Sequence, residues 1–268
     1  ASGFRTRCIV IMPDKASIAY FATLFGVTAA TLYLVPPVEQ EACKELSFST
    51  FFSGSSNLKG MAKEFLECGE AYKADNPVSA IVLYSVLYTA FLAASVPGCT
   101  TMLSVLSGAL WHPAISILLI TINSSTGGLC AYYLSHLMLR ETVTKRFPSL
   151  FTKLRKSIES FGSNIWFAMI FLRVTPLVPN WFVSLGAPMV DMPPHVFFFG
   201  GMIGFIPSGI FHCLNGRALK QLVDSQGVDP KKAFLTLFGL QFIVLLPLWL
   251  CGKRSADKLA AEIRDKKD

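Results

Sequence analysis

Long apolar runs without charged residues constrain this chain more than any other feature. Residues 16–35 hold no Asp, Glu, Lys or Arg over twenty positions and end at Pro36 and Pro37. A helix of that length rises about 30 Å, which matches the hydrocarbon core of a bilayer. The sequence therefore predicts a transmembrane helix here, and a signal peptide is the alternative interpretation. Three further spans are predicted over residues 114–139, 196–214 and 233–250.

The composition supports a membrane protein and excludes two other classes. Charged residues make up 15% of the chain, against about 25% in typical soluble domains. Hydrophobic residues reach 52%, and the mean hydropathy is +0.50. Such a chain is neither disordered nor a nucleic-acid-binding module, so the net charge of +7 is interpreted as charge that flanks membrane segments.

Residues 38–77 form the one long hydrophilic segment, with a local charge of −3. Apolar residues recur at helical spacing from Leu58 to Gly69, which predicts an amphipathic helix on the membrane or on the bundle. Cys43 and Cys68 both lie here; they would form a disulfide if the segment faces an oxidising lumen, and free thiols are the alternative. None of the seven cysteines groups with another cysteine or a histidine at metal-ligand spacing, so neither a metal site nor a cofactor is predicted.

Two apolar segments are broken by proline or glycine. The first, residues 78–95, is followed by Pro97 and Gly98 and then by a second apolar piece that ends at Trp111. Lipid cannot satisfy the backbone groups that such a break frees, so the break must lie in protein or beside water. We expect a re-entrant hairpin near residues 78–112, with a simple kink as the alternative; Pro207, in a later span, is also open to interpretation as a kink.

The second break, near residues 160–192, contains the sequence FLRVTPLVPNWF at 171–182. An arginine inside a membrane segment is costly unless it faces water, a partner or an anionic ligand, so Arg173 is the leading site candidate, with a lipid phosphate as its expected partner. The alternatives are that it reaches the headgroup layer or caps helix carbonyls. Asn180 is either a polar site residue or a partner for broken backbone, and Trp181 is expected to be an interfacial anchor.

The charges between spans predict the orientation. Residues 140–156 have a balance of +5, which by the positive-inside rule makes that loop cytosolic. The resulting fold is an all-α polytopic membrane protein with about four full spans and two opposed re-entrant hairpins in an inverted repeat. Its predicted parts are residues 1–37 (cytosolic tip and first span), 38–77 (lumenal or interfacial segment), 78–214 (core) and 215–268 (loop, last span and basic cytosolic tail).

Two broken segments in corresponding halves are the sequence signature of a transporter whose site lies where the breaks meet. No G-x-S-x-G, H-E-x-x-H or P-loop motif is present, so no enzyme activity is expected. Asp191 and His195 could form a titrating pair in a proton-coupled carrier, but solvation at the membrane interface is the favoured interpretation of both residues.

These motifs resemble one known family. The second break, the stretch FFFGGMIGFIP at 197–207 and the run FLAASVPGCTTMLSVLSGALW at 91–111 are similar to the DedA/VTT-domain superfamily, and most of all to its eukaryotic transmembrane protein 41 branch. The resemblance covers roughly residues 91–222. The residues that match its re-entrant motifs and the following span are Pro97, Gly98, Arg173, Pro176, Pro179, Asn180, Trp181, Gly204 and Pro207.

The resemblance implies a multi-pass protein of the endoplasmic reticulum that scrambles phospholipids between leaflets without ATP, linked in relatives to autophagosome formation and lipoprotein export. Its expected partners are membrane phospholipids and membrane proteins, not nucleic acid. Bacterial DedA proteins carry a second arginine where this chain has Pro179, and often an acidic residue where it has Cys99 to Thr101, which disfavours proton coupling. The alternatives are a proton-coupled carrier of an anionic lipid and a scaffold that transports nothing.

Overall fold

The computed structural model describes residues 15–37, 39, 43, 58–96, 98–140, 145, 152, 155, 164–174 and 180–224. Within these residues every regular element is helical, as predicted, and no strand occurs. The elements are α1 (Lys15–Leu34), α3 (Leu58–Asp75), α4 (Pro77–Ala93), α5 (Cys99–Leu110), α6 (Pro113–Met138), α9 (Ile165–Val174), α10 (Asn180–Gly186), η3 (Ala187–Val190) and α11 (Pro194–Asp224). The predicted span 233–250 lies outside the described residues.

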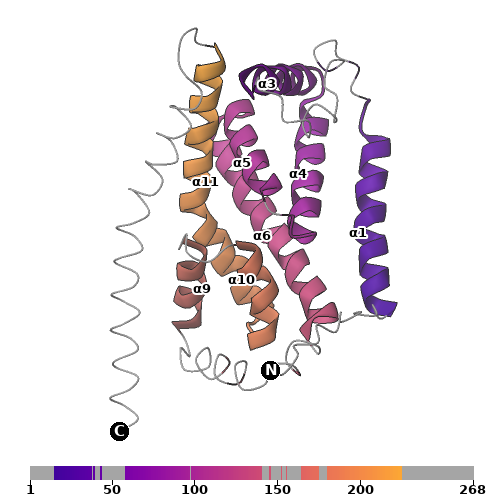
Figure 1. The fold of residues 1–268 in the computed structure, drawn as a ribbon, viewed down its shortest axis with the longest axis vertical. Helices are drawn as coiled ribbons and strands as arrows, with labels where there is room; N and C mark the ends of the chain where they lie inside the picture. Colours follow the sequence, from indigo (N-terminus) through magenta and orange to yellow (C-terminus); the bar gives the residue numbers. More distant parts are fainter. Residues whose placement is uncertain are drawn as a thin grey trace, which may run out of the picture.

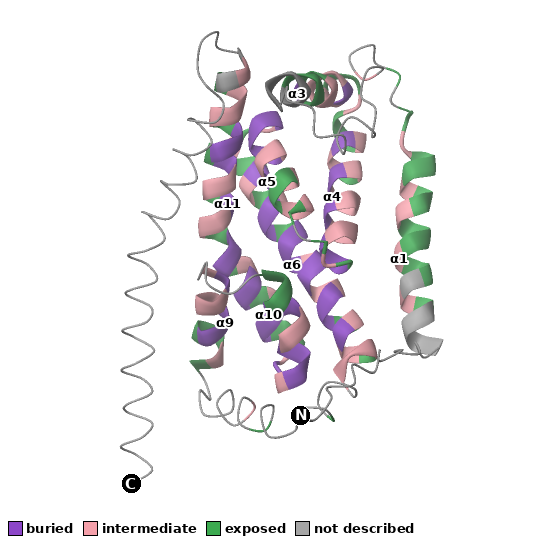
Figure 2. Ribbon diagram, in the orientation of Figure 1, coloured by how far each residue is buried: buried purple, intermediate pink, exposed green. Residues whose placement is uncertain are grey.

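Two of the described helices are long and apolar enough to cross a membrane: α6, with 26 residues, and 28 residues of α11. α1 has 20 residues and covers the first predicted span. It exposes large apolar side chains, including Phe25, Tyr33 and Leu34, to its surroundings (Figure 2). Thr28 and Thr31 donate hydroxyl hydrogen bonds to backbone carbonyls four residues earlier, so these groups need no water. The surface and hydrogen bonding suit an all-helical membrane protein.

Helices α4 and α5 form a helical hairpin, called hairpin 1 below. The chain turns through Ser95 and Gly98, whose φ angles are 55° and 89°. Glycine adopts that left-handed conformation without strain, which explains the glycine at the start of α5. Across the hairpin, the Tyr88 hydroxyl lies 3.0 Å from Ser104 Oγ. Figure 1 shows α5 returning to the end of the molecule from which α4 came.

Helices α9 and α10 form a second pair, called hairpin 2. Their connection, residues 175–179, lies outside the described residues. Arg173 at the end of α9 donates a hydrogen bond of 3.1 Å to the carbonyl oxygen of Asn180, the first residue of α10, so the two helices meet at this tip. Behind it, Met169 and Val183 share one buried cluster with Tyr132 of α6 and Phe197 of α11.

Each hairpin is followed by a long helix, and the two units run in opposite directions. Hairpin 1 and α6 form the first unit, and hairpin 2 and α11 form the second (Figure 1). Hairpin 1 opens toward the end where α3 lies, whereas hairpin 2 opens toward the opposite end (Figure 1). This arrangement follows from the two breaks in sequence, because a short helix that ends at Pro or Gly must turn back to keep its backbone satisfied.

Glycines let α11 approach the helices of both units. A Cβ on Gly204 would lie 2.6 Å from Arg173 Cβ of α9, and a Cβ on Gly216 would lie 2.0 Å from the Val105 carbonyl oxygen of α5. No real side chain tolerates such distances, so α11 packs backbone to backbone, as small residues allow in membrane helices. α11 is therefore fixed to hairpin 2 in its first half and to hairpin 1 in its second.

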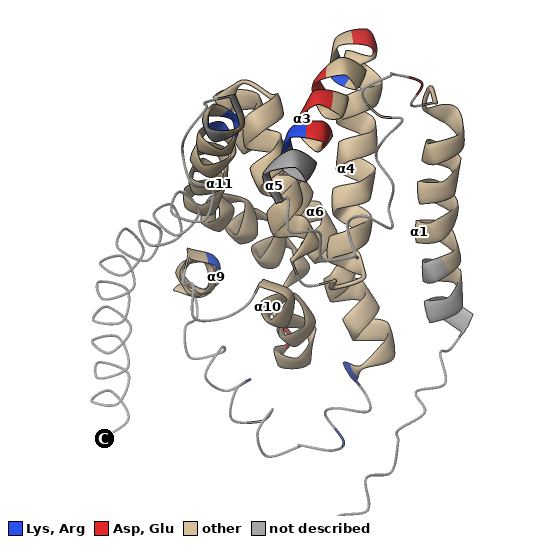
Figure 3. Cartoon of the chain, turned by 45° about the horizontal axis from the view of Figure 1, so that its top comes forward, with Lys and Arg blue, Asp and Glu red and all other residues tan. Residues whose placement is uncertain are grey.

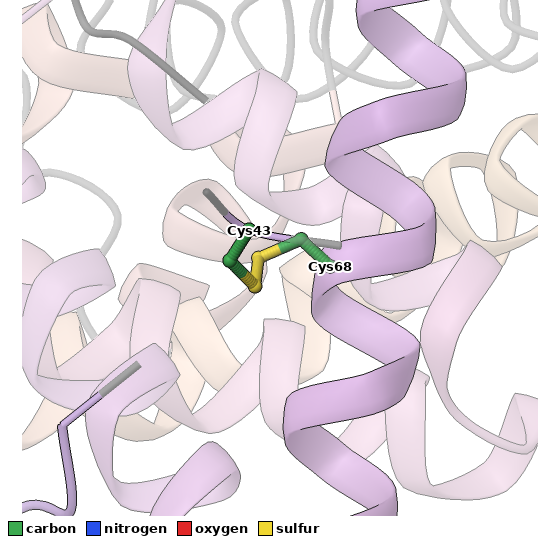
Figure 4. Close-up of a disulfide and its surroundings, with 2 residues drawn as sticks. All are labelled: Cys43 and Cys68. Atoms are coloured by element: carbon green, nitrogen blue, oxygen red, sulfur yellow. A yellow bond between two sulfur atoms is a disulfide. The ribbon is translucent and has the colours of Figure 1, made fainter. Parts of the chain in front are cut away.

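Helix α3 lies across one end of the bundle and carries much of the charge on the described chain. Figure 3 shows Lys, Arg, Asp and Glu along α3, whereas the helices beneath it are nearly free of charged residues. Of the two alternatives for Cys43 and Cys68, the structure has the disulfide, with their Cα atoms 4.9 Å apart (Figure 4). The bond joins α3 to the chain that follows α1.

Candidate functional site

A row of buried small and polar residues runs along the inner side of α6. We call it the α6 stripe; its members are Ser116, Thr121, Asn123, Ser124, Ser125, Gly128, Tyr132 and Ser135. From the first to the last residue it extends about 29 Å, close to the thickness of the hydrocarbon core. Hydroxyl and amide groups are expensive to bury in an apolar helix, so a stripe of this length needs partners along its whole course.

Hairpin 1 supplies partners for the first half of the stripe. The Tyr88 hydroxyl of α4 lies 2.7 Å from Ser124 Oγ, and Asn123 Nδ2 donates a 3.1 Å hydrogen bond to Ser85 Oγ. Nearer the α3 end, Ser107 Oγ of α5 donates to Ser116 Oγ at 3.0 Å. These three hydrogen bonds join hairpin 1 to the first half of the stripe, whereas the buried hydroxyl of Thr121 has no hydrogen-bond partner among the described residues.

Hairpin 2 and the residues after it supply partners for the second half. Ser135 Oγ donates to the Leu185 carbonyl oxygen at 2.7 Å, and the Tyr132 hydroxyl donates to the Met192 carbonyl oxygen at 2.8 Å. Both acceptors are backbone atoms close to the breaks in regular helix, where carbonyls lack helical partners. The stripe thus satisfies the irregular backbone of the second unit.

Arg173 lies at the centre of this arrangement, where it is only 4% exposed. Its guanidinium donates to the Asn180 carbonyl oxygen and, at 3.2 Å, to Ser184 Oγ. The rings of Phe197 and Phe205 each lie 4.7 Å from its Cζ, a distance that gives a cation–π attraction. The Asn180 carbonyl belongs to the first residue of α10, so this contact joins the end of α9 to the start of α10.

The groups that contact the charged guanidinium of Arg173 are neutral: a carbonyl oxygen, a hydroxyl and two aromatic rings. Within the described part of the chain no carboxylate lies at ion-pair distance from it. Its Nε is buried without a hydrogen-bond partner among those residues. A guanidinium carries five N–H donors, so this one keeps donor capacity for an anionic or carbonyl-bearing ligand.

A pair of adjacent glycines on α6 lies between the two hairpins. A Cβ on Gly127 would lie 2.9 Å from Leu92 Cβ of hairpin 1, and one on Gly128 would lie 3.5 Å from a terminal nitrogen of Arg173 in hairpin 2. The two glycines thus let both hairpins approach α6 closely. Both hairpins therefore reach the same level of α6, from opposite ends of the molecule (Figure 1).

The other predicted site residues lie in varied surroundings. Gly98 is exposed at the tip of hairpin 1, and Trp181 is 42% exposed and packs edge-on against Phe182. The side chain of Asn180 is exposed, and Pro207 lies inside α11. Pro97, Pro176 and Pro179 fall outside the described residues.

Sequence reasoning missed Ser184, Phe197 and Phe205 as contacts of Arg173, and it missed four members of the α6 stripe: Ser116, Thr121, Tyr132 and Ser135. Ser184, which accepts from Arg173, carried no recognisable motif, because its role depends on the turn of hairpin 2. The stripe did leave a signal, because residues 123–128 are six consecutive small or polar residues within an otherwise apolar span.

A group of ionic contacts lies at the end of the molecule opposite α3. Asp191, in the left-handed conformation after η3, pairs with Arg140 and, at 2.6 Å, with Arg155. The ring of His195 instead packs against Trp166, with centroids 5.8 Å apart. The contacts of Asp191 are thus with two arginines, and those of His195 are aromatic.

The comparison with known proteins identifies the core. The family model of the VTT domain matches residues 96–218, which contain α5, α6 and the second unit up to α11. A transmembrane protein 41 homolog of Caenorhabditis elegans is 30% identical over 73% of this chain and 79% of its own length. Transmembrane protein 41B of Xenopus tropicalis is 30% identical over 87% of this chain and 82% of its own length.

A further relative is longer than this chain. The transmembrane protein 41 homolog of Dictyostelium discoideum is 31% identical over 66% of this chain, and the match spans 52% of that protein's length. No solved structure matches the chain. The matched core, the two hairpins and the extent of identity lead to one assignment: this chain belongs to the transmembrane protein 41 branch of the DedA/VTT-domain family.

Proposed function

We propose that this chain is a phospholipid scramblase, which lets lipid headgroups pass between the leaflets of a bilayer without ATP. The observation that carries the proposal is the α6 stripe, a row of polar groups about as long as the bilayer core is thick. A headgroup faces a high barrier in hydrocarbon because nothing there replaces its hydration. A continuous series of hydroxyls lowers that barrier at every level.

In the proposed mechanism the two hairpins cover the stripe at rest and move away from it in turn. When hairpin 1 separates from α6, hydroxyls such as Ser124 exchange their protein partners for water and headgroup oxygens. When hairpin 2 separates, Arg173 donates to the lipid phosphate through nitrogens that now bond Asn180 and Ser184. The acyl tails stay in lipid, and each contact is weak enough to release.

The proposed location is the endoplasmic reticulum membrane, with a role in autophagosome formation and in lipid and lipoprotein handling. The α3 end then faces the lumen and the basic residues 140–156 face the cytosol. The disulfide between Cys43 and Cys68 supports this orientation, since disulfides persist in oxidising compartments. Family resemblance is the support for the cellular role.

The direct test uses fluorescent phospholipids in liposomes that contain the purified protein, with no nucleotide and no ion gradient. An impermeant reductant bleaches only lipids that reach the outer leaflet. Scrambling predicts bleaching well beyond the outer-leaflet half, whereas bleaching that stops at half in protein-containing vesicles contradicts the proposal.

The role of Arg173 is tested in the same assay with Arg173→Ala. We expect slower bleaching, because the path loses its charged donor, while the matched variant Arg217→Ala, at an exposed position on α11, keeps the wild-type rate. Equal rates for Arg173→Ala and wild type, at equal amounts of reconstituted protein, would remove Arg173 from the path.

The alternative of a proton-coupled carrier has less support. Its expected titrating pair, Asp191 and His195, has other partners: two arginines and an aromatic ring. A lipid flux that appears only with an imposed pH difference would favour that carrier. Loss of partner binding in Arg173→Ala with unchanged lipid movement would favour a scaffold.

A further inference from the structure

Helix α3 bridges the open end of hairpin 1 and the last turns of α11. Leu66 of α3 shares a buried cluster with Ala109 and Leu110 of α5, and Val223 of α11 packs against that cluster. Gly69 leaves no spare room, since a Cβ there would lie 3.1 Å from a Leu110 methyl carbon. α3 is therefore fitted closely to hairpin 1.

Polar contacts tie α3 to both units. Lys73 donates to the Leu110 carbonyl oxygen, one of the terminal carbonyls of α5 that lack a helical partner. Glu70 pairs with Lys220 of α11. Through these two contacts α3 joins hairpin 1, which covers the first half of the α6 stripe, to α11 of the other unit.

The disulfide holds α3 from the side of α1. It joins Cys68, in the middle of α3, to Cys43, 25 residues earlier. Tyr72 also donates a 3.0 Å hydrogen bond to the Pro36 carbonyl oxygen, just after α1. α3 is therefore anchored on one side to the chain that follows α1 and on the other to hairpin 1 and α11 (Figures 1 and 4).

We propose that the Cys43–Cys68 disulfide makes α3 a clamp that restricts opening of hairpin 1, so that reduction of this bond releases the hairpin. The redox step needs a dithiol reductant: the S–S bond breaks, each sulfur gains one proton and one electron, and the dithiol becomes a disulfide. Once the disulfide is reduced, only weak polar and apolar contacts hold α3 in place, because no cross-link restricts its movement. The effect on lipid movement rests on the scramblase function proposed above.

The test compares Cys43→Ser/Cys68→Ser with wild type by hydrogen exchange followed by mass spectrometry, in lipid nanodiscs. Amides of α5 should exchange roughly tenfold faster in the variant, whereas those of α10, which lies away from α3, should be unchanged. Cys130→Ser is the matched control, because it replaces a free cysteine and should change neither helix. Wild type treated with dithiothreitol provides a second route that changes no residue, so the test survives a variant that fails to fold.

Lipid movement is measured on the same proteins with the fluorescent-lipid assay, and we expect several-fold faster bleaching in the variant than in oxidised wild type. Unchanged exchange in α5 after both substitution and reduction would overturn the clamp. Faster α5 exchange with equal or slower lipid movement would overturn its control of transport. Faster α5 exchange with no lipid movement in any of these proteins would leave the clamp intact and refute the scramblase function.

Discussion

At the residue scale, the burial of Arg173 depends on the absence of a side chain at Gly204 of the neighbouring helix α11. Gly204 makes room for the first carbons of the arginine, because a Cβ there would lie 2.6 Å from Arg173 Cβ and 3.1 Å from the Ile170 carbonyl oxygen. We predict that Gly204→Ala separates α9 from α11 and lowers stability by about 1–3 kcal/mol, the usual cost of overpacking. The thermal unfolding midpoint in detergent measures this loss.

The matched control at this scale is Gly186→Ala. Nothing lies within 4 Å of a Cβ at Gly186, and the φ angle there is −82°, which alanine adopts freely. We expect a midpoint equal to or slightly above wild type, since alanine favours the helix. A midpoint for Gly204→Ala as high as that of Gly186→Ala would contradict the close packing around Arg173.

At the scale of elements, the proposed path opens only if hairpin 2 separates from α6. A Cβ on Gly128 would lie 3.4 Å from Ser184 Oγ, so cysteines at these two positions are near enough for a disulfide. We predict that oxidised Gly128→Cys/Ser184→Cys fixes hairpin 2 to α6 and lowers lipid movement at least several-fold, as a blocked conformational step should. Each single variant, treated with the same oxidant, controls for the substitutions, and an undiminished rate in the cross-linked protein would exclude movement of this hairpin.

The helices could largely be predicted from the sequence, whereas the side-chain contacts between them could not. The lengths of apolar runs and the breaks at Pro97–Gly98 and after Arg173 are local features, so the sequence alone indicated α1, the two hairpins and the long helices between them. The disulfide stayed undecided, because whether Cys43 meets Cys68 depends on how α3 lies over the bundle. Ser184 meets Arg173 only after the chain turns, which no periodicity reveals.

At the scale of the whole molecule, the two ends differ in charge and in the presence of a disulfide, and this difference predicts the orientation of the protein in the membrane. The α3 end carries the disulfide and exposed acidic residues such as Glu64, and the opposite end carries Arg140, Lys145 and Arg155. We predict that Glu64→Cys in sealed microsomes is protected from an impermeant maleimide, whereas Lys145→Cys is labelled, because basic loops stay in the cytosol. Detergent should expose both positions, and labelling of Glu64→Cys before detergent would reverse the orientation.

The exposed turn of hairpin 1 also has a consequence for the membrane itself. Ser95 and Gly98 leave helical geometry at the tip, and Gly98 is exposed, so we expect the irregular backbone at this level to need water or headgroups as hydrogen-bond partners. A bilayer that yields locally costs less to deform when it is thin, and hydrophobic mismatch sorts proteins among membranes of different thickness. We therefore expect lipid movement to slow steadily as the acyl chains of the liposomes lengthen, whereas a rate independent of chain length would contradict local thinning. A rate that falls with chain length would mean that the shape of one turn makes the protein work best in thin bilayers.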